Sequence, residues 1–402
     1  MNYWLTNVKM ETGYLYQDDW AYGTQTALVA LRIEAGLFKE IIPMNEWQAD
    51  ELPVVDGHGA LLLPGIVEKH CHLDKSKLGS PWQPVAPASS IVERFEQEIP
   101  ALDALPLSIE ERAQNLIDAE LTHGVTRFRS HIDIEPATEL RYLKAIQQLV
   151  ADAPYDVEFV AFPQHGFLRS NSESLVEAAL KAGAQLIGGV DPYTLDGDYQ
   201  TTLKKTFDLA KKYQAGIDIH LHNRETAGRE TIKEIIRLTE EYGWQGQVAI
   251  SHAFGLNDFT GAERKQVFQA LAENNIHIIS SIPLSLGTIP PLRELQAYGV
   301  QVHIGCDNVY DSWSTLGDGS LQQKLVRYLE IFSVSTQEEL TQSLGLITDH
   351  ITTLDQNGQR SWPNLNDEAT FILTAADCSA EFVSRETPVE TSYLRGNQVY
   401  QR

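Results

Sequence analysis

The stretch GIVEKHCH, residues 65–72, is an apolar run that ends in two histidines one residue apart. Seven further runs follow it, and each ends in polar or turn-forming residues: GVTRFRSHIDI (124–134), YDVEFVAFPQHG (155–166), AQLIGGVDP (184–192), GIDIHLH (216–222), GQVAISHAF (246–254), NIHIISSIPL (275–284) and VQVHIGCDNV (300–309). Between the runs lie amphipathic stretches with apolar residues at three- and four-residue spacing, such as residues 137–153 and 199–214. Eight strand–helix units in series predict an α/β fold, a (β/α)8 TIM barrel.

The two ends of the chain have a different pattern. Residues 1 to about 60 contain strand-like pieces without a convincing helix, and the tail from residue 367 is rich in strand-like pieces too. We expect the two ends to pair, which predicts a small β-sandwich domain of residues 1–62 plus 362–402 and a barrel domain of residues 63–361. In a TIM barrel the catalytic groups lie at the C-terminal ends of the barrel strands, so we expect none in the small domain.

Composition limits the partners and the compartment. The chain has 55 acidic residues against 31 Lys plus Arg, a net charge of -24, which disfavours nucleic acid and anionic membranes. Its three cysteines are far apart and form no CxxC, as is typical of a reducing compartment. The N-terminus lacks the pattern of a signal peptide, and no uncharged apolar run approaches about 18 residues. We therefore predict a cytoplasmic protein with a small-molecule substrate and no membrane, and leave a homo-oligomer open.

Polar side chains at four strand ends are expected to meet at one mouth of the barrel. They are His70 and His72 in the first run, His220 and His222 in the fifth, His252 in the sixth and Asp307 in the eighth. Alternate residues of a strand share a face, so each histidine pair points to one side. Three imidazoles and a carboxylate, with a position left open for water, form a site for Zn²⁺ or Fe²⁺ and metal-activated hydrolysis. Ordinary hydrogen-bonded strand ends are the alternative, but an inward cluster of unpaired polar groups is costly without a purpose. The other histidines weighed, which lack this placement, are His58, His123, His277, His303 and His350.

The order of the motifs resembles the amidohydrolase superfamily, and within it the cytosine deaminase-like branch with the related triazine-ring aminohydrolases. The likeness covers nearly the whole chain and is carried by HCHLDK (70–75), FPQHG (162–166), SHAFG (251–255) and GCDNVYDSWSTLGDGSLQQ (305–323). It implies a hydrolase that acts on carbon–nitrogen bonds other than peptide bonds.

The resemblance also implies roles for single residues. One divalent metal ion, zinc or iron, would be held by His70, His72, His220 and Asp307. Because no lysine closes the fourth strand, a second bridged metal is not expected. His252 would contact the metal-bound water, and Asp307 would also accept its proton as general base. The residues expected to touch the substrate are Phe162, Gln164, His222, Asn308 and Trp313; for Gln164 and Trp313, a loop cap and plain core packing are the competing explanations.

Two positions depart from the deaminase pattern. The deaminases have a proton-transferring glutamate three residues after the strand-five histidine, and this chain has Asn223 there. An amide cannot exchange a proton as a carboxyl group does, and general acid–base catalysis is worth about 10²- to 10⁴-fold. Glu225 or His222 could take over the proton transfer, although Glu225 is also explained as a solvated loop charge. Asn308 likewise replaces an acidic residue of cytosine deaminase.

These observations predict a mononuclear metal-dependent amidohydrolase of the deaminase or aminohydrolase type. It would hydrolyse a C–N bond of a small, cyclic, nitrogen-containing substrate through a metal-activated water. A hydrolase of linear or cyclic amides is one alternative, and a catalytically silent ligand-binding homologue is another. The loop of residues 73–85 is expected over the mouth, with Asp74, Lys75 or Trp82 near the substrate.

Overall fold

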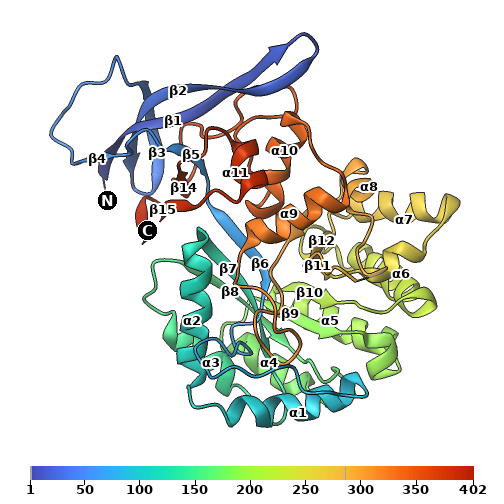
Figure 1. Ribbon diagram of the computed structural model, residues 1–402. Coiled ribbons are helices and arrows are strands. Elements are labelled where there is room, and N and C mark those ends of the chain that lie inside the picture. The colour runs from blue at the N-terminus through green and yellow to red at the C-terminus, as the bar shows by residue number, and fades with distance from the viewer. Residues whose placement is uncertain (1, 286) are drawn as a thin grey trace.

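A computed structural model describes residues 2–285 and 287–402, which form a barrel domain and a small sheet domain (Figure 1). The barrel has eight parallel strands paired in chain order: β6 (Ile66–Cys71), β7 (Val125–Asp133), β8 (Asp156–Phe162), β9 (Leu186–Val190), β10 (Gly216–His220), β11 (Val248–Ser251), β12 (His277–Ser280) and β13 (Val302–Ile304). Each strand lies within one of the eight apolar runs. The predicted TIM barrel is confirmed.

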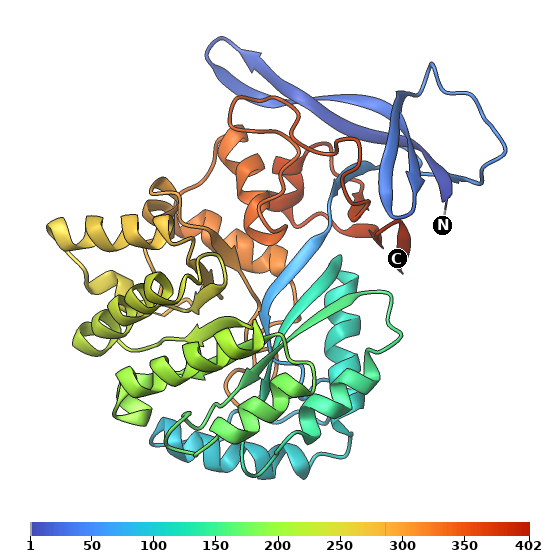
Figure 2. The ribbon, with the colours of Figure 1, turned by 180° about the vertical axis from the view of Figure 1, so that it is seen from behind.

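Helices follow every barrel strand and surround the sheet (Figure 2). They are α1 (Ile91–Asp103) and α2 (Ile109–Thr122) after β6, then α3 (Arg141–Leu149), α4 (Glu173–Lys181), α5 (Tyr199–Tyr213), α6 (Glu225–Tyr242), α7 (Gly261–Glu273), α8 (Leu292–Ala297), α9 (Leu321–Ile331) and α10 (Gln337–Ser343). Local sequence explains where several begin. For example, Ser108 and Glu111 form a reciprocal capping box at the start of α2, which satisfies backbone N–H groups that the helix itself leaves free. Short turns of helix are η1 (Pro192–Asp196), η2 (Phe254–Asp258) and η3 (Leu344–Ile347).

Both ends of the chain enter one mixed sheet, which confirms a small β-rich domain built from the two ends; its strands form one sheet and not the two packed sheets of the expected sandwich. Its strand order is β16-β15-β14-β5-β1-β2-β3, with β4 paired to β1. The strands are β1 (Asn2–Gln17), β2 (Trp20–Glu34), β3 (Leu37–Pro43), β4 (Val54–Asp56), β5 (Leu61–Pro64), β14 (Phe371–Thr374), β15 (Val389–Leu394) and β16 (Asn397–Gln401). The tail, which was expected to be rich in strands, also holds a helix, α11 (Ser379–Arg385). The exact boundaries at residues 62 and 362 stay a prediction.

Two glycines allow close approaches that hold the barrel together. Only Gly65 separates β5 of the small domain from β6 of the barrel, and a Cβ there would lie 2.7 Å from Cγ2 of Thr370. At the seam that closes the barrel, a Cβ on Gly305 would lie 2.6 Å from Cβ of His70. The backbone N–H of Asp307 donates to the His70 carbonyl across this seam at 2.7 Å. The chain can therefore bring His70 and Asp307 side by side.

In the described chain, no helix combines the length and the apolar character needed to span a membrane.

Candidate metal centre

Four strand ends bring imidazole and carboxylate groups together at one mouth of the barrel. His70 lies in β6, His220 ends β10, His252 follows β11 and Asp307 follows β13. One donor atom from each of these four residues lies within 4.8 Å of the others. His252 and Asp307 have positive φ angles of 67° and 61°, so the backbone makes a left-handed turn just beyond each strand. The structure thus assembles a potential cation site from residues up to 237 positions apart, the separation of positions 70 and 307.

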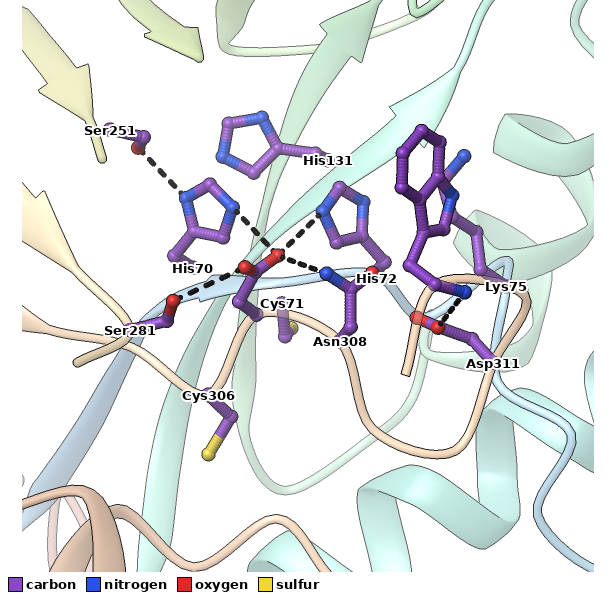
Figure 3. Close-up of polar contacts among 12 residues, drawn as sticks. His70, Cys71, His72, Lys75, His131, Ser251, Ser281, Cys306, Asn308 and Asp311 are labelled. Carbon is purple, nitrogen blue, oxygen red and sulfur yellow. Dashed lines mark hydrogen bonds and ion pairs between the residues drawn. The ribbon is translucent and has the colours of Figure 1, made fainter. Parts of the chain in front are cut away.

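The side chains of His70, His72, Asn308 and Ser281 point toward one common position (Figure 3), and their printed contacts assign that position to the Asp307 carboxylate. Nε2 of His70 and Nε2 of His72 lie 3.5 and 3.4 Å from its Oδ1, and Asn308 donates to the same oxygen at 3.0 Å. Ser281 donates its hydroxyl to Oδ2 at 3.3 Å. Burial alone would raise the pKa of Asp307, but the histidines around it hold that pKa well below its ordinary value. Asp307 is therefore an ionised carboxylate.

The histidine nitrogens fit a bound divalent cation. Among the residues that the structure describes, Nε2 of His70, both ring nitrogens of His220 and Nε2 of His252 are buried without a hydrogen-bond partner. Burial holds the pKa values of His220 and His252 well below the ordinary range and also lowers that of His72. These imidazoles are thus neutral, the form that ligates metals. Leaving such groups unpaired is costly, and a cation would satisfy them.

His131 is a member of the cluster that the sequence reasoning missed. Its ring, at the end of β7, lies 4.3 Å from the His70 ring and 4.5 Å from the His220 ring, measured between centroids. It is fully buried, and neither ring nitrogen has a hydrogen-bond partner among the described residues. The available signal was its place in SHID, residues 130–133, at the end of the second apolar run.

A chain of hydrogen bonds behind the cluster orients His70. Nδ1 of His70 lies 2.8 Å from the Ser251 hydroxyl, which donates to Asp218 at 2.7 Å. Asp218 also accepts a hydrogen bond from Arg129 at 3.1 Å. Such outer contacts select the tautomer and the ring orientation of a metal-binding histidine, so Nε2 of His70 is directed at the cluster.

A cavity of about 50 Å³ opens beside the cluster. It brings together most of the residues predicted to touch the substrate, and its predicted members are Phe162, Gln164, His222, Asn308 and Trp313. Phe95 and Ile91 of α1 complete its apolar wall. The Phe162 ring stacks on His220 with centroids 4.3 Å apart, so the aromatic wall adjoins the potential metal site directly.

A buried polar network fixes two of these cavity residues. The Lys75 ammonium donates to Glu98, Asp133 and the Gln164 amide oxygen at 3.0, 2.7 and 2.8 Å. The Gln164 amide nitrogen donates to Glu98 at 2.7 Å, and the Trp313 indole donates to the other Glu98 oxygen at 2.9 Å. Burial acts against the charge of Lys75, but Asp133 and Glu98 outweigh it and raise the Lys75 pKa. The network therefore holds Gln164 and Trp313 in fixed orientations.

The loop expected over the mouth contributes differently from the prediction. Asp74 and Lys75 are buried rather than facing the cavity, and Asp74 accepts the backbone N–H of Asp133 at 2.7 Å. Trp82 is 69% exposed and stacks on Tyr310 with centroids 5.4 Å apart. None of Asp74, Lys75 and Trp82 lines the cavity.

His222 and Asp191 form an ion-paired couple at the cavity. Nδ1 of His222 lies 3.0 Å from Oδ2 of Asp191, and the His222 ring lies 4.3 Å from that of His252. Burial acts to lower the pKa of His222, but Asp191 outweighs it and the pKa is raised. The side chain of Asn223 instead exchanges hydrogen bonds with Thr194, and Glu225 is exposed at the start of α6. Neither Asn223 nor Glu225 lines the cavity.

A parallel barrel with a histidine–aspartate cluster at the strand ends defines a class of hydrolases that act on small molecules through a bound cation. The chain belongs to the amidohydrolase family, whose sequence model matches residues 97–400. A protein of Escherichia coli (strain K12) named "Uncharacterized protein YahJ" is 36% identical, over 99% of this chain and 88% of its own length.

Two solved structures are similar along the whole chain. The N-isopropylammelide isopropylaminohydrolase of Burkholderia multivorans has a TM-score of 0.86 at 27% identity and covers 100% of this chain and 98% of its own. The 5-methylcytosine deaminase of Klebsiella pneumoniae has a TM-score of 0.80 at 24% identity, with 99% and 97% coverage, and shows the shared fold. The predicted superfamily, its cytosine deaminase-like branch and the class of non-peptide C–N hydrolases are confirmed.

Proposed function

We propose that this enzyme holds one divalent cation, zinc or iron, and hydrolyses an exocyclic C–N bond of a small nitrogen heterocycle, releasing an amine. The observation that carries the proposal is the position of the histidine–aspartate cluster at a cavity with an aromatic wall of Phe162 and Trp313. Flat aromatic faces suit a planar ring, and a neighbouring amide, Gln164, suits the polar edge of a heterocycle.

In this proposal His70, His72, His220 and Asp307 hold the cation. A cation held there would supply Lewis-acid chemistry, lowering the pKa of a water molecule and polarising the bond that is attacked. The donor set of neutral imidazoles and one ionised carboxylate suits both zinc and Fe²⁺. Because the Ser251 hydroxyl donates to Asp218, Nδ1 of His70 donates to Ser251, which leaves Nε2 of His70 free for the cation.

Asp307 deprotonates the attacking water, and His252 contacts it. As the water oxygen bonds to the ring carbon, Asp307 takes its proton, because Asp307 is ionised and lies at the cluster. Nδ1 of His252 lies 4.0 Å from Oδ2 of Asp307, so its ring can contact the same water. Asn308 and Ser281 keep the carboxylate in place.

His222 supplies the proton that the leaving amine needs. The C–N bond breaks, the ring carbon keeps the water oxygen as a hydroxyl group, and the amine nitrogen gains a proton from the His222 imidazolium. Asp191 stabilises the charged form of His222. At the end of the cycle, the proton that Asp307 took from the water replaces the proton that His222 gave to the amine. The His222–Asp191 couple takes the role that a glutamate has in the deaminases. Asn223 cannot take that role, because an amide does not transfer protons and its side chain is bonded to Thr194.

An alkylamine is the leaving group that we favour. The similarity to an N-isopropylammelide isopropylaminohydrolase over the whole chain supports an alkylamino-substituted ring as the substrate. Ring amines of pyrimidines are the closest alternative. Hydrolysis of a cyclic amide remains a second candidate, because the glutamate that serves ring deamination is replaced by Asn223.

The first experiment combines elemental analysis with product analysis. We expect about one zinc or iron per chain, lost in His70→Ala and retained in His58→Ala, whose side chain is 86% exposed. The same samples are incubated with alkylamino-s-triazines, aminopyrimidines and cyclic amides. Release of a free amine with a hydroxylated ring supports the proposal, whereas a ring-opened carboxylate product supports the amide candidate. A folded protein that takes up no metal, even after reconstitution, contradicts both and leaves a ligand-binding homologue.

A further inference from the structure

A second cavity, of about 380 Å³, is also lined by the Asp307–Asn308 segment. Asp307 and Asn308 line both cavities, so the second one adjoins the metal centre. Its opposite wall is α9, which contributes Lys324 and Arg327. These two residues are three positions apart and therefore lie on the same face of the helix.

The two cations of this cavity have no acidic partner. In residues 2–285 and 287–402, no carboxylate oxygen lies within 4.0 Å of the Lys324 or Arg327 side-chain nitrogens. Arg327 donates one side-chain hydrogen bond, to the Gln323 amide oxygen at 3.1 Å, and no other side-chain hydrogen bond of Arg327 is present among the described residues. This is unusual on a chain with 55 acidic and 31 basic residues, where carboxylates for pairing are plentiful.

The remaining lining is made of small hydrogen-bond donors. Ser281, Ser285 and Ser314 line the cavity, and Ser281 also donates to Oδ2 of Asp307 at 3.3 Å. Asp307 is the single carboxylate in the described lining, and its charge is already shared with the histidine cluster. Leu284 and Leu316, each 68% exposed, lie at its open side. Two cations without acidic partners, together with several hydroxyl groups, supply the charge and the hydrogen-bond donors that an oxyanion requires.

We propose that this second cavity binds an anionic oxygen group, a carboxylate or an inorganic oxyanion, beside the metal centre. The binding itself does not depend on the proposed reaction. Its use for a carboxylate carried by the substrate rests on the proposed function. In that case Lys324 and Arg327 select substrates with an acidic substituent, since a neutral substituent would leave both cations without a partner.

Sulfate binding tests the site without any turnover. Thermal unfolding is followed at constant ionic strength while sulfate replaces chloride, for the wild type, for Lys324→Gln with Arg327→Gln, and for the exposed-lysine control Lys265→Gln. We expect a saturating rise in Tm for the wild type and the control, and at least about tenfold weaker sulfate binding in the double variant. Equal responses in all three proteins, or no response in the wild type, overturn the proposal.

Kinetics then identify the source of the anion. Two alkylamino heterocycles that differ only in a carboxylate on the alkyl group are compared by their ratio of kcat/KM. If the anion belongs to the substrate, this ratio falls about tenfold or more in the double variant. If sulfate binds but the ratio is unchanged, the site serves a free anion. Inactivity toward both heterocycles counts against the proposed function alone, because the sulfate result stands independently.

Discussion

At the scale of single residues, the site works by giving neighbouring groups opposite charge states. Burial keeps the imidazoles of His220 and His252 neutral, while the surrounding histidines keep Asp307 ionised. His222 stands apart because Asp191 lies 3.0 Å away and raises its pKa. The groups proposed to bind a cation and the group proposed to give up a proton are thus distinguished by their environment and not by residue type.

His222→Gln tests this division of roles. We expect kcat to fall by about 10²- to 10⁴-fold with the metal content unchanged, because glutamine cannot donate the proton that the amine requires. Steady-state kinetics and elemental analysis on the same samples measure both effects. His58→Gln is the matched control on the surface, with an 86% exposed side chain. A larger loss in Glu225→Gln than in His222→Gln would assign the proton transfer to Glu225 instead.

At the scale of elements, one buried lysine ties four segments of the barrel together. Lys75 lies just after β6 and bonds to Glu98 of α1, Asp133 of β7 and Gln164 after β8. All four side chains are at most 4% exposed. In such a network each partner is satisfied only while the others are in place, so removal of the cation leaves buried acidic groups without compensation.

Lys75→Met should therefore lower the free energy of unfolding by about 3–5 kcal/mol, as for breaking other buried ion pairs. Urea denaturation measures the change, and Lys144→Met, on the exposed face of α3, should change it by less than about 0.5 kcal/mol. Adding Glu98→Gln to Lys75→Met should restore part of the loss, since it removes the unpaired charge. A loss below about 1 kcal/mol for Lys75→Met would show that the network is not stabilising.

A second buried acid predicts a pH effect. Burial is the main cause that raises the pKa of Glu135, from 4.5 to about 7. Above pH 4.5 Glu135 ionises in the unfolded chain but stays protonated in the folded chain. The free energy of unfolding therefore falls as the pH rises to 7 and then levels off. Glu135→Gln keeps an acceptor for the His165 N–H and removes this penalty. We expect the variant to gain stability relative to the wild type between pH 4.5 and 7, by at most about 3 kcal/mol. A difference that does not change over this range contradicts the assignment.

At the scale of the whole molecule, the metal centre joins distant parts of the chain. Its groups come from β6, from the end of β10 and from the segments that follow β11 and β13, and only Gly65 separates β6 from β5 of the small domain sheet. A bound cation would therefore stabilise the closed barrel as a whole. Without the cation, the buried ring nitrogens of His70, His220 and His252 would have no partner among the described residues.

Removal of the cation by a chelator should lower Tm by about 5 °C or more, because a ligand that binds only the folded state stabilises it by mass action. Differential scanning calorimetry of treated and untreated protein measures this. Restoring zinc or iron should return Tm to its starting value. His70→Ala serves as the control and should show no chelator effect, and the same chelator shift in that variant would place the stabilising cation elsewhere.

The sequence by itself determined the barrel, the sheet built from both ends of the chain, and the set of polar strand ends. These features depend on local patterns: short apolar runs, amphipathic spacing between them, and histidines or an aspartate at the ends of some of the runs. The family membership rests on the same motifs and on the match over residues 97–400.

Only the tertiary structure decided which polar residues meet. His131 joins the cluster, Lys75 is buried in a network, and Asn223 turns toward Thr194, none of which follows from local spacing. The physical reason is that the charge and hydrogen bonds of a buried group depend on neighbours from other strands, up to hundreds of positions away in the chain. Strand pairing and barrel closure set those neighbours, and with them the charge states on which the proposed chemistry depends.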